Sequence, residues 1–203
     1  MSDNRWQGEA ARGHSSAMIA DLCHLAHTAH DDDLDGLHFV APTGRRCYAV
    51  TGSPLGELVV LGDGEAVVQI SLLRDVLGGP GIDPAWIKEP APLADAVTQL
   101  GDYFAGRLTA FKLTLAPGGT PFQQQVWRHL ARIPYGTTTT YGDIARAIGR
   151  PSAFRAVGAA NGRNPIPIIL PCHRVIAGNG SLIKYGLGGL SCKRQLLDLE
   201  QGR

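Results

Sequence analysis

Residues 120–175 read TPFQQQVWRHLARIPYGTTTTYGDIARAIGRPSAFRAVGAANGRNPIPIILPCHRV, and this stretch decides how the C-terminal half of the chain folds. Thr120 is expected to cap a helix in which Pro121 takes the first position. An N–H at that position has no partner within the helix, so the proline costs no hydrogen bond. Two shorter helices are predicted over residues 141–148 and 153–161, separated by a turn that holds a glycine and a proline. This order predicts a helix-turn-helix, a plan that places its second helix in a DNA groove.

The second of these helices is built almost entirely from small side chains. We expect Ser152 to cap it, and Arg155 is the long side chain that interrupts the alanines and glycines. Small residues allow close approach to another surface, which could be a neighbouring helix as well as DNA. Helix packing would account for the alanines, but not for Arg155 or for the polar end at Asn161–Asn164.

A cysteine and a histidine stand side by side at Cys172 and His173, directly after an apolar run. The thiolate is the nucleophilic form of cysteine, and a free cysteine with a pKa near ~8.5 is mostly protonated at neutral pH unless a base or a positive charge lies close. His173 and Arg174 could supply both. The alternative is that Cys172 is simply a small buried hydrophobe. Three prolines stiffen the approach to the motif, namely Pro165, Pro167 and Pro171.

Charge is distributed unevenly along the chain. The 203 residues carry a net charge of +1, so the overall charge indicates no particular partner. Between residues 123 and 163, however, the acidic side chains are limited to Asp143. A local basic face is typical of nucleic-acid binding, although solvated basic faces are also common. The arginines of this segment are Arg128, Arg132, Arg146, Arg150, Arg155 and Arg163.

Cysteine spacing and apolar runs indicate the compartment. The four cysteines contain no CxxC pair, and we interpret them as reduced thiols of a cytoplasmic protein, associated with the nucleoid in a prokaryote. Residues 1–16 lack the apolar core of a secretory signal. No apolar run approaches the ~20 residues that span a bilayer, so we expect no membrane association.

Residues 1–45 differ from the rest of the chain and are predicted to be a polar, His- and Asp-rich extension. A helix over residues 17–29 would place Cys23, His27 and His30 near one face, a spacing that could hold a metal. Three ligands without an obvious fourth are too few, so we prefer a mobile or surface extension and predict no metal site.

Residues 46–116 are predicted to form a small α+β domain with few catalytic side chains. A hairpin turn over residues 51–56 joins two β-rich runs, and the 3.6-residue period of apolar residues indicates one helix. The predicted strands are residues 47–50, 57–61, 66–72 and 111–115, and the predicted helix is 91–105. A last amphipathic helix is expected over residues 192–199, with Leu196, Leu197 and Leu199 facing inward.

The segment 120–200, with its Pro-Cys-His-Arg-Val motif beside a helix-turn-helix, closely resembles the O6-alkylguanine-DNA alkyltransferases, also called methylated-DNA–protein-cysteine methyltransferases. A looser resemblance covers residues 47–115, where GSPLGELVV and YFAGRLTAF are similar to the N-terminal domain of that family. The resemblance implies an α+β protein: a small N-terminal α/β domain of ribonuclease H type, then a winged helix-turn-helix alkyltransferase domain over residues 117–203.

The resemblance also implies the chemistry. Members of the family move an alkyl group from guanine O6, and also from thymine O4, to their own cysteine without a cofactor. A buried glutamate and a histidine act through a water to deprotonate that cysteine, and the matching residues are Cys172, His173 and Glu200. A thioether has no route back to the thiol, so each molecule reacts once.

The family reaches its target by rotating the nucleotide out of double-stranded DNA, with the second helix in the minor groove. Arg155 matches the residue inserted into the base stack, and Tyr141 matches the tyrosine that meets the flipped guanine. The other residues that match DNA contacts are Ala153, Ala156, Gly158, Ala159, Asn164 and Thr137. Besides Tyr141, the residues that match the base pocket are Val175, Tyr185, Gly186 and Pro167.

This sequence departs from the family pattern in the loop after Tyr185, which is one residue longer than usual. Lys184 and Cys192 also replace commoner residues. A second methyl-acceptor module is not expected, and the protein is expected to be a monomer. One alternative function is a non-reacting protein that binds alkylguanine lesions, but such relatives lack the cysteine that Cys172 provides. A cysteine hydrolase is a weaker alternative, because no oxyanion-hole sequence is evident.

Overall fold

A mixed sheet forms the N-terminal part of the protein in the computed structural model, which describes residues 34 and 36–202. Its strand order is β1-β6-β4-β3-β2-β5. The strands are β1 (Leu37–Phe39), β2 (Cys47–Thr51), β3 (Leu58–Gly62), β4 (Val67–Leu72), β5 (Ile87–Lys88) and β6 (Leu113–Leu115). The helices of this part are α2 (Leu73–Leu77), the 3₁₀ turn η1 (Ala91–Leu93) and α3 (Ala94–Phe104).

The β2–β3 hairpin is antiparallel and pairs Val50 with Val59, as predicted from the turn between them. All five residues of β3 are buried, which fits a central strand that is covered on both faces. The predicted strand over 111–115 is shorter and begins at Leu113. Helix α2 was not predicted from the sequence.

The strand β1 corrects the prediction that residues 1–45 form an extension. Leu37–Phe39 pairs in parallel with Leu113–Leu115 and forms an edge of the sheet. The guanidinium carbon of Arg128 lies 4.7 Å from the ring centroid of Phe39, so β1 also contacts the C-terminal part. A strand of three residues gives too short an alternation to be recognised from sequence. The predicted helix over residues 17–29, with Cys23, His27 and His30, lies outside the described residues.

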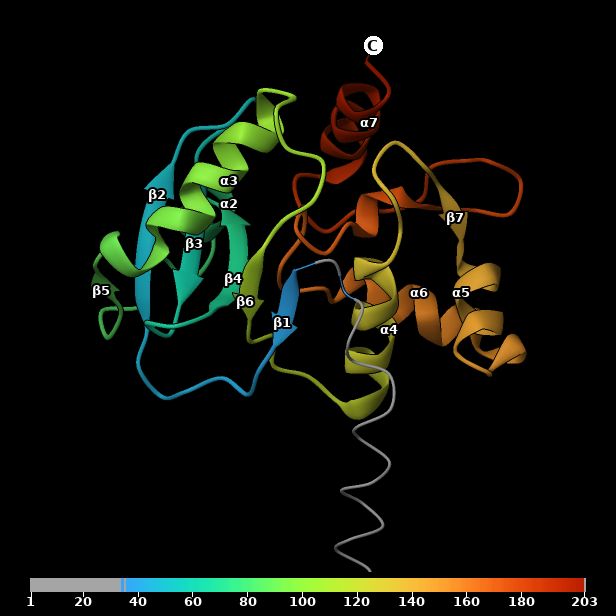
Figure 1. Ribbon diagram of the computed structural model, residues 1–203, viewed down its shortest axis with the longest axis horizontal. Coiled ribbons are helices and arrows are strands. Elements are labelled where there is room, and N and C mark those ends of the chain that lie inside the picture. Colours follow the sequence, from blue (N-terminus) through green and yellow to red (C-terminus); the bar gives the residue numbers. More distant parts are fainter. Residues whose placement is uncertain (1–33, 35, 203) are drawn as a thin grey trace, which may run out of the picture. The chain divides into compact units, whose positions relative to one another are not determined.

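The C-terminal part is built from four helices and two short strands within the described residues. Its elements are α4 (Pro121–Ala131), β7 (Thr139–Thr140), α5 (Tyr141–Ala147), the 3₁₀ turn η2 (Pro151–Ala153), α6 (Phe154–Gly162), the 3₁₀ turn η3 (Cys172–Arg174), β8 (Val175–Ile176) and α7 (Gly189–Glu200). Strands β7 and β8 pair in parallel. Figure 1 shows α4, α5 and α6 grouped beside β1, with α7 next to α3.

Local sequence explains where α4 and α5 begin. Thr120 forms a capping box with Gln123 at the start of α4, where Pro121 takes the first position as predicted. Thr140 forms a second capping box, with Asp143, at the start of α5. The prediction for Ser152 was wrong: it lies within η2, and α6 begins after Ala153 with no side-chain cap. The proline at 151 starts a 3₁₀ turn, so the α-helix begins at Phe154, one residue later than a cap at Ser152 would give.

The helix-turn-helix is held to α4 by a buried tryptophan. The Nε1 atom of Trp127 donates to the carbonyl oxygen of Ala160 at 2.9 Å, which joins α4 to α6. Val157 and Ala160 supply the buried face of α6. Some of the small residues of α6 therefore do pack against a neighbouring helix, while the face with Arg155 and Ala159 stays exposed.

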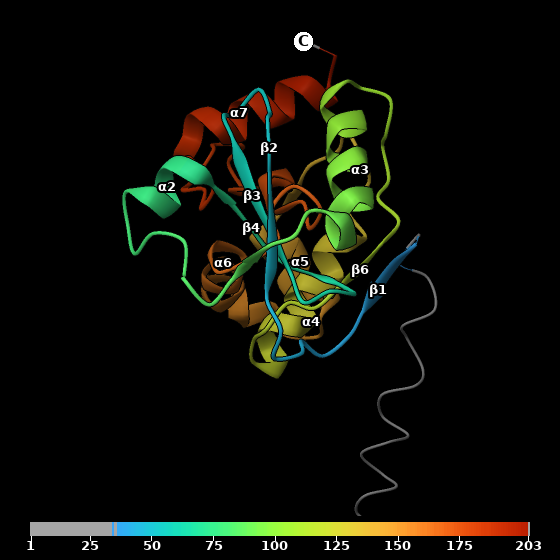
Figure 2. The ribbon, with the colours of Figure 1, turned by 90° about the vertical axis from the view of Figure 1, so that its left-hand side faces the viewer.

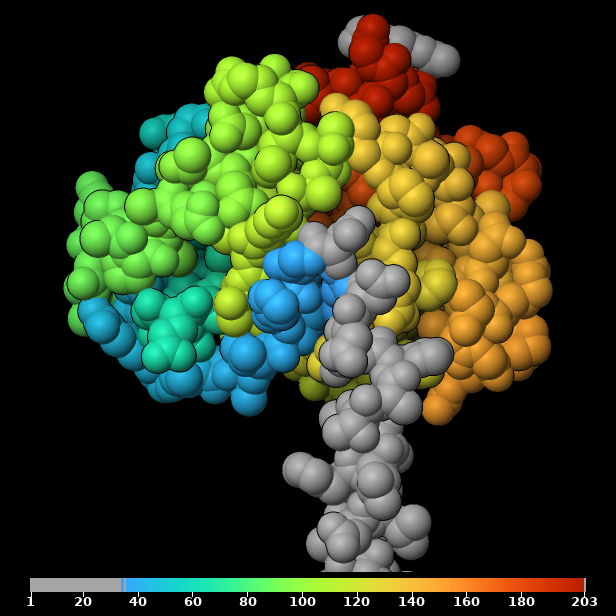
Figure 3. Space-filling view, viewed as in Figure 1, coloured from blue at the N-terminus to red at the C-terminus, as the bar shows by residue number. Residues whose placement is uncertain are grey.

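The two parts meet along an extended contact: Figure 3 shows them packed side by side, and in Figure 2 the N-terminal sheet lies in front of the C-terminal helices. The backbone N–H of Ile70 in β4 donates to the carbonyl oxygen of Pro165 at 2.9 Å. The Tyr103 hydroxyl of α3 donates to Glu200 of α7 at 2.7 Å. Among residues 34 and 36–202, no helix is both long enough and apolar enough to cross a membrane.

Candidate active site

The 3₁₀ turn η3 places Cys172, His173 and Arg174 in succession, and all three side chains are buried. The segment that leads into it contains Ile168 at φ +76°. A β-branched residue in the left-handed region is strained, and such strain persists only where the surroundings enforce it. The turn before the cysteine is therefore held in one conformation by its contacts.

Asn164 provides the main polar contacts of that segment. Its Nδ2 donates to the carbonyl oxygen of Leu170 at 2.7 Å, and its Oδ1 accepts from the N–H of Ile166 at 3.0 Å. Both bonds close the loop that carries Ile168. Asn164, which matches a DNA contact of the family, lies between the end of α6 at Gly162 and the turn η3 that begins at Cys172.

Glu200 is a shared hydrogen-bond acceptor for several neighbouring groups. Its Oε1 lies 2.8 Å from His173 Nε2 and accepts from Arg174 Nη2 at 2.8 Å and from the Tyr103 hydroxyl at 2.7 Å. Its Oε2 accepts from Arg174 Nε at 2.9 Å and from the Gly136 N–H at 3.2 Å. The structure thus brings the predicted pair His173 and Glu200 together, and it adds three donors that were not predicted.

These contacts fix the charge of Glu200 and, through it, the tautomer of His173. Burial alone would raise the pKa of Glu200, but the bonds and charges of His173 and Arg174 outweigh it and lower the pKa to about 2. A carboxylate cannot donate, so His173 Nε2 must carry the hydrogen of this contact. Burial lowers the pKa of His173, which is therefore neutral at pH 7 with its lone pair on Nδ1. That Nδ1 atom is buried and has no hydrogen-bond partner among the described residues.

Burial favours the thiol form of the resting Cys172 over the thiolate. Burial raises the pKa of Cys172 to about 11, although the side chains of Asn164 and Tyr185 and the charge of Lys193 act in the opposite direction. Arg174 donates hydrogen bonds to Glu200, and it is not among the groups that favour the thiolate form of Cys172. The thiolate must therefore form when the reaction begins, which requires a base.

Lys193 is a buried cation that sequence reasoning missed. It is fully buried, and its Nζ donates to the carbonyl oxygen of Val175 at 2.6 Å. Burial lowers the pKa of Lys193, and the nearby Cys172 raises it. The signal was present in the sequence, because Lys193 lies seven residues before Glu200 and shares the inward face of the last helix with it.

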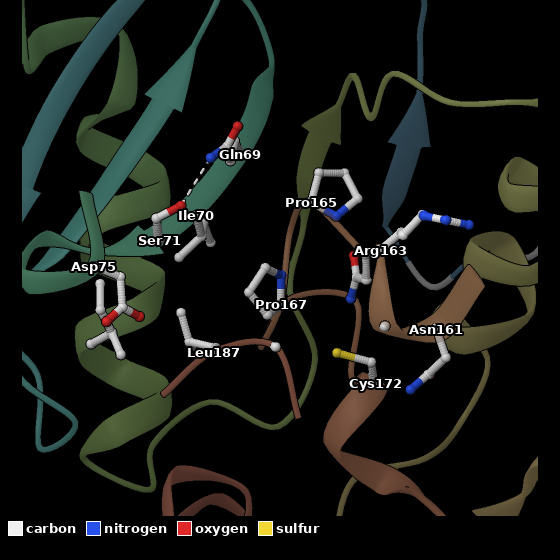
Figure 4. Close-up of a pocket in the computed structure, with 14 residues that line it drawn as sticks. Gln69, Ile70, Ser71, Asp75, Asn161, Arg163, Pro165, Pro167, Cys172 and Leu187 are labelled. Atoms are coloured by element: carbon white, nitrogen blue, oxygen red, sulfur yellow. Dashed lines mark hydrogen bonds between the residues drawn. The ribbon is translucent and has the colours of Figure 1, made fainter. Parts of the chain in front are cut away.

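A pocket of about 390 Å³ opens beside Cys172. Three of the predicted site residues line it together with the cysteine, namely Asn164, Pro167 and Gly186. The opposite wall comes from the N-terminal part, which was not predicted: Gln69, Ile70, Ser71, Leu72 and Asp75. Figure 4 shows the sulfur of Cys172 on one side of this space and Asp75 on the other. Val175 and Tyr185 are buried and do not line this pocket.

The extra residue of the loop after Tyr185 is accommodated by two glycines. Gly188 and Gly189 both have positive φ, and a Cβ atom on Gly188 would lie 2.5 Å from the sulfur of Cys192. Leu187 is consequently turned inward, where it is buried and lines the pocket.

Tyr141 lines a second groove, of about 600 Å³, beside α5 and α6. Burial raises the pKa of Tyr141, and the nearby Cys172 adds to this effect, so its hydroxyl keeps its proton. Gly158 of α6 lies against this ring, since a Cβ atom there would be 3.7 Å from Tyr141 Cδ1. Phe154 forms part of the same groove, is 47% exposed and was not predicted as a site residue.

The remaining predicted DNA contacts lie mostly at the surface. Arg155, Ala156 and Ala159 are exposed on α6, and Ala153 is half-buried just before it. The guanidinium carbon of Arg155 lies 5.5 Å from the ring centroid of Phe154. Thr137 is exposed, and its hydroxyl donates to the carbonyl oxygen of Pro134. In the described part of the chain, no cluster of histidine, cysteine and acidic side chains could hold a metal ion.

Comparison with known proteins agrees with this geometry. Residues 47–117 match the ribonuclease-like domain of 6-O-methylguanine DNA methyltransferase, and residues 121–202 match its DNA-binding domain. The methylated-DNA–protein-cysteine methyltransferase of Mycobacterium tuberculosis is 47% identical over 159 residues, 77% of this chain and 93% of the relative. That of Methanosarcina acetivorans is 47% identical over 155 residues, 75% of this chain and 97% of the relative.

Solved structures give the same result. The crystal structure of Mycobacterium tuberculosis OGT in complex with DNA is 46% identical, covers 77% of this chain and 93% of its own, and has a TM-score of 0.70. The expected α+β architecture, with an N-terminal ribonuclease-like domain and a C-terminal DNA-binding domain, is confirmed. The chain therefore belongs to the O6-alkylguanine-DNA alkyltransferase family, the methylated-DNA–protein-cysteine methyltransferases.

Proposed function

We propose that Cys172 is the alkyl acceptor of this methylated-DNA–protein-cysteine methyltransferase, which repairs DNA by direct reversal. The substrate is double-stranded DNA that contains O6-alkylguanine, and O4-alkylthymine is a second substrate. The observation that carries the proposal is the buried pair of His173 and Glu200, 2.8 Å apart, which joins the turn that holds Cys172 to the end of α7.

In this proposal the proton of the Cys172 thiol moves to His173 Nδ1 through a water. Glu200 is ionised, and its hydrogen bond to Nε2 stabilises the imidazolium that forms. The charge of Lys193 favours the thiolate at the same moment. The cysteine is therefore unreactive at rest and becomes a nucleophile only when the proton has a place to go.

The thiolate then attacks the alkyl carbon, so the S–C bond forms while the C–O6 bond breaks. The electron pair of that bond stays on the guanine, which must gain a proton to leave as the normal base. The proton taken from the thiol balances this gain. In this proposal Tyr141, which keeps its hydroxyl proton, donates a hydrogen bond to the base. The product thioether is stable, so each molecule acts once.

We propose that α6 enters the minor groove with its exposed face of small residues. A minor groove carries little sequence information, which suits a protein that must find lesions in any sequence. Arg155 fills the gap left by the rotated nucleotide, whose unstacking costs a few kcal/mol. The protein acts as a monomer in this proposal. A cytoplasmic site is supported by the free thiols of Cys47, Cys172 and Cys192.

The test is to incubate the protein with a duplex that contains O6-methylguanine and to measure its intact mass. We expect a gain of one methyl group on Cys172, no gain in Cys172→Ala, and an unchanged gain in the control Cys192→Ala. Cys172→Ala should still bind the duplex. Wild-type protein that binds the duplex without gaining mass would instead be a lesion-binding protein, and turnover of an ester or peptide would indicate a hydrolase.

A further inference from the structure

The buried hydroxyl of Tyr103 is a polar group that the mechanism above does not use. Tyr103 lies near the end of α3 in the N-terminal part, and it is fully buried. Its hydroxyl donates to Oε1 of Glu200 at 2.7 Å, across 97 positions of sequence. The N-terminal part thus reaches the carboxylate that orients the histidine beside the cysteine.

Tyr103 and His173 use the same oxygen of Glu200. Oε1 accepts from both of them and from Arg174 Nη2, Arg174 Nε is shared by the two oxygens, and Oε2 also accepts from the Gly136 N–H. Hydrogen bonds to one carboxylate oxygen must approach it along separate lone-pair directions. The bond from the Tyr103 hydroxyl therefore restricts where Oε1 can lie. It therefore also restricts the line along which His173 Nε2 meets the carboxylate.

The Tyr103 hydroxyl is the donor of this bond, and Glu200 is the acceptor. Burial raises the pKa of Tyr103 well above its ordinary value, and the charge of Glu200 raises it further, so the phenol stays protonated. The ring is also fixed in place. Its centroid lies 5.4 Å from that of Phe111 and 6.1 Å from that of Tyr135, in tilted and edge-on arrangements.

We propose that Tyr103 is a positioning residue for alkyl transfer, which holds Glu200 in the orientation that lets His173 accept the proton of Cys172. This inference rests on the proposed function, and it makes the N-terminal domain a contributor to the reaction as well as to the fold. Nothing in the sequence around Tyr103 indicates this role, because the contact exists only where α3 meets α7.

The role has a consequence for pH dependence. A hydrogen bond from a neutral donor lowers the basicity of a carboxylate. Without the Tyr103 hydroxyl, Glu200 becomes more basic, so the imidazolium form of His173 is favoured and the histidine stays protonated up to a higher pH. The acid limb of the alkylation rate therefore moves to higher pH. The maximal alkylation rate, reached at the plateau of the pH profile, falls as well, because the Glu200 carboxylate is held by fewer hydrogen bonds.

The test compares Tyr103→Phe with the matched control Tyr135→Phe in the full chain. Both changes remove one phenolic hydroxyl from the same aromatic cluster, and no hydrogen bond of the Tyr135 hydroxyl is found among the described residues. The probe is free O6-benzylguanine, which requires neither DNA binding nor nucleotide rotation. The measurement is the single-turnover rate of Cys172 alkylation as a function of pH.

We expect Tyr103→Phe to lower the plateau by about tenfold or more, as for loss of a hydrogen bond to a charged group, and to shift the acid limb to higher pH. Tyr135→Phe should leave both unchanged. Incorporation of 3-fluorotyrosine at position 103, whose more acidic hydroxyl donates more strongly, should shift the limb to lower pH. This second substitution keeps the buried hydrogen bond if Tyr103→Phe fails to fold.

An unchanged pH profile in Tyr103→Phe, with a loss of thermal stability alone, would overturn the inference and leave Tyr103 a structural residue. So would equal effects of Tyr103→Phe and Tyr135→Phe. These outcomes differ from failure of the proposed function, in which the wild-type protein itself would not transfer the benzyl group, or Cys172→Ala would still accept it.

Discussion

His173 Nε2 lies 2.8 Å from Oε1 of Glu200, and both side chains are shielded from solvent. The pair joins the turn that carries Cys172 to the last turn of α7. Because Arg174 also binds Glu200, the carboxylate is ionised and the histidine is neutral at pH 7. The neutral histidine can act as a base, and it follows the protonated Cys172 directly in the chain. The following predictions test this arrangement.

Replacing Glu200 by glutamine should slow alkylation of Cys172 and raise the apparent pKa of its thiol. The amide carries no charge to stabilise the imidazolium. Its NH₂ group would also face the N–H and O–H donors that bind the carboxylate in the wild type. The expected loss in rate is about tenfold or more. The measurement is the rate of reaction with free O6-benzylguanine as a function of pH, with Asp198→Asn on the same helix as the control. An unchanged pH profile would remove Glu200 from the mechanism.

Glu200 should also make the protein sensitive to acid. Its pKa of about 2 in the folded protein lies below the ordinary value of 4.5, so its contribution to stability is present above pH 4.5 and is lost as the pH falls toward 2. The shift corresponds to about 3 kcal/mol. In urea unfolding, the stability difference between wild type and Glu200→Gln should shrink as the pH falls through this window. A difference that stays constant would contradict the assignment.

Substitutions of Asn164 should separate the shape of the loop from its electrostatics. Asn164→Ala loses both bonds to the loop and should cost about 1–3 kcal/mol of stability. Asn164→Asp keeps the acceptor for Ile166 but places a negative charge near Cys172, which raises the pKa of that thiol. We therefore expect slower alkylation by O6-benzylguanine in Asn164→Asp than in Asn164→Ala. Equal rates in the two variants would mean that the loop geometry alone matters.

Arg155→Ala should slow repair of duplex DNA much more than reaction with free O6-benzylguanine. The base need not be unstacked when it is free, and unstacking costs a few kcal/mol, so the selective loss should be about tenfold or more. Arg107→Ala is the matched control, because Arg107 is also exposed but pairs with Asp102 in the N-terminal part. Equal losses with both substrates would rule out a role for Arg155 in filling the base stack.

Much of the fold follows from short patterns in the sequence. The Thr120–Pro121 start of α4 and the hairpin between β2 and β3 depend on residues within a few positions of each other, and the structure contains both. Predictions that needed the exact local geometry were less successful. Ser152 has the chemistry of a cap, but the turn that begins at Pro151 carries the chain past it before the α-helix starts.

The Pro-Cys-His-Arg motif identified Cys172, and the resemblance supplied its link to Glu200. The state of that cysteine was not predictable, because a pKa depends on burial and on charges that only packing brings close. From the sequence alone, His173 and Arg174 could both activate Cys172, whereas in the structure burial raises the pKa of Cys172 to about 11 and Arg174 binds Glu200. Lys193 was overlooked because a lysine in a helix is usually solvated.

The sequence by itself thus determined the helix-turn-helix and the family and predicted the nucleophile, since each is encoded by neighbouring residues whose side chains and caps act locally. Only the tertiary structure decided which groups meet at Glu200 and which residues of β4 face Cys172 across the pocket. Those contacts join segments far apart in the chain, and their energies depend on exclusion of water, which arises only when the two parts pack together.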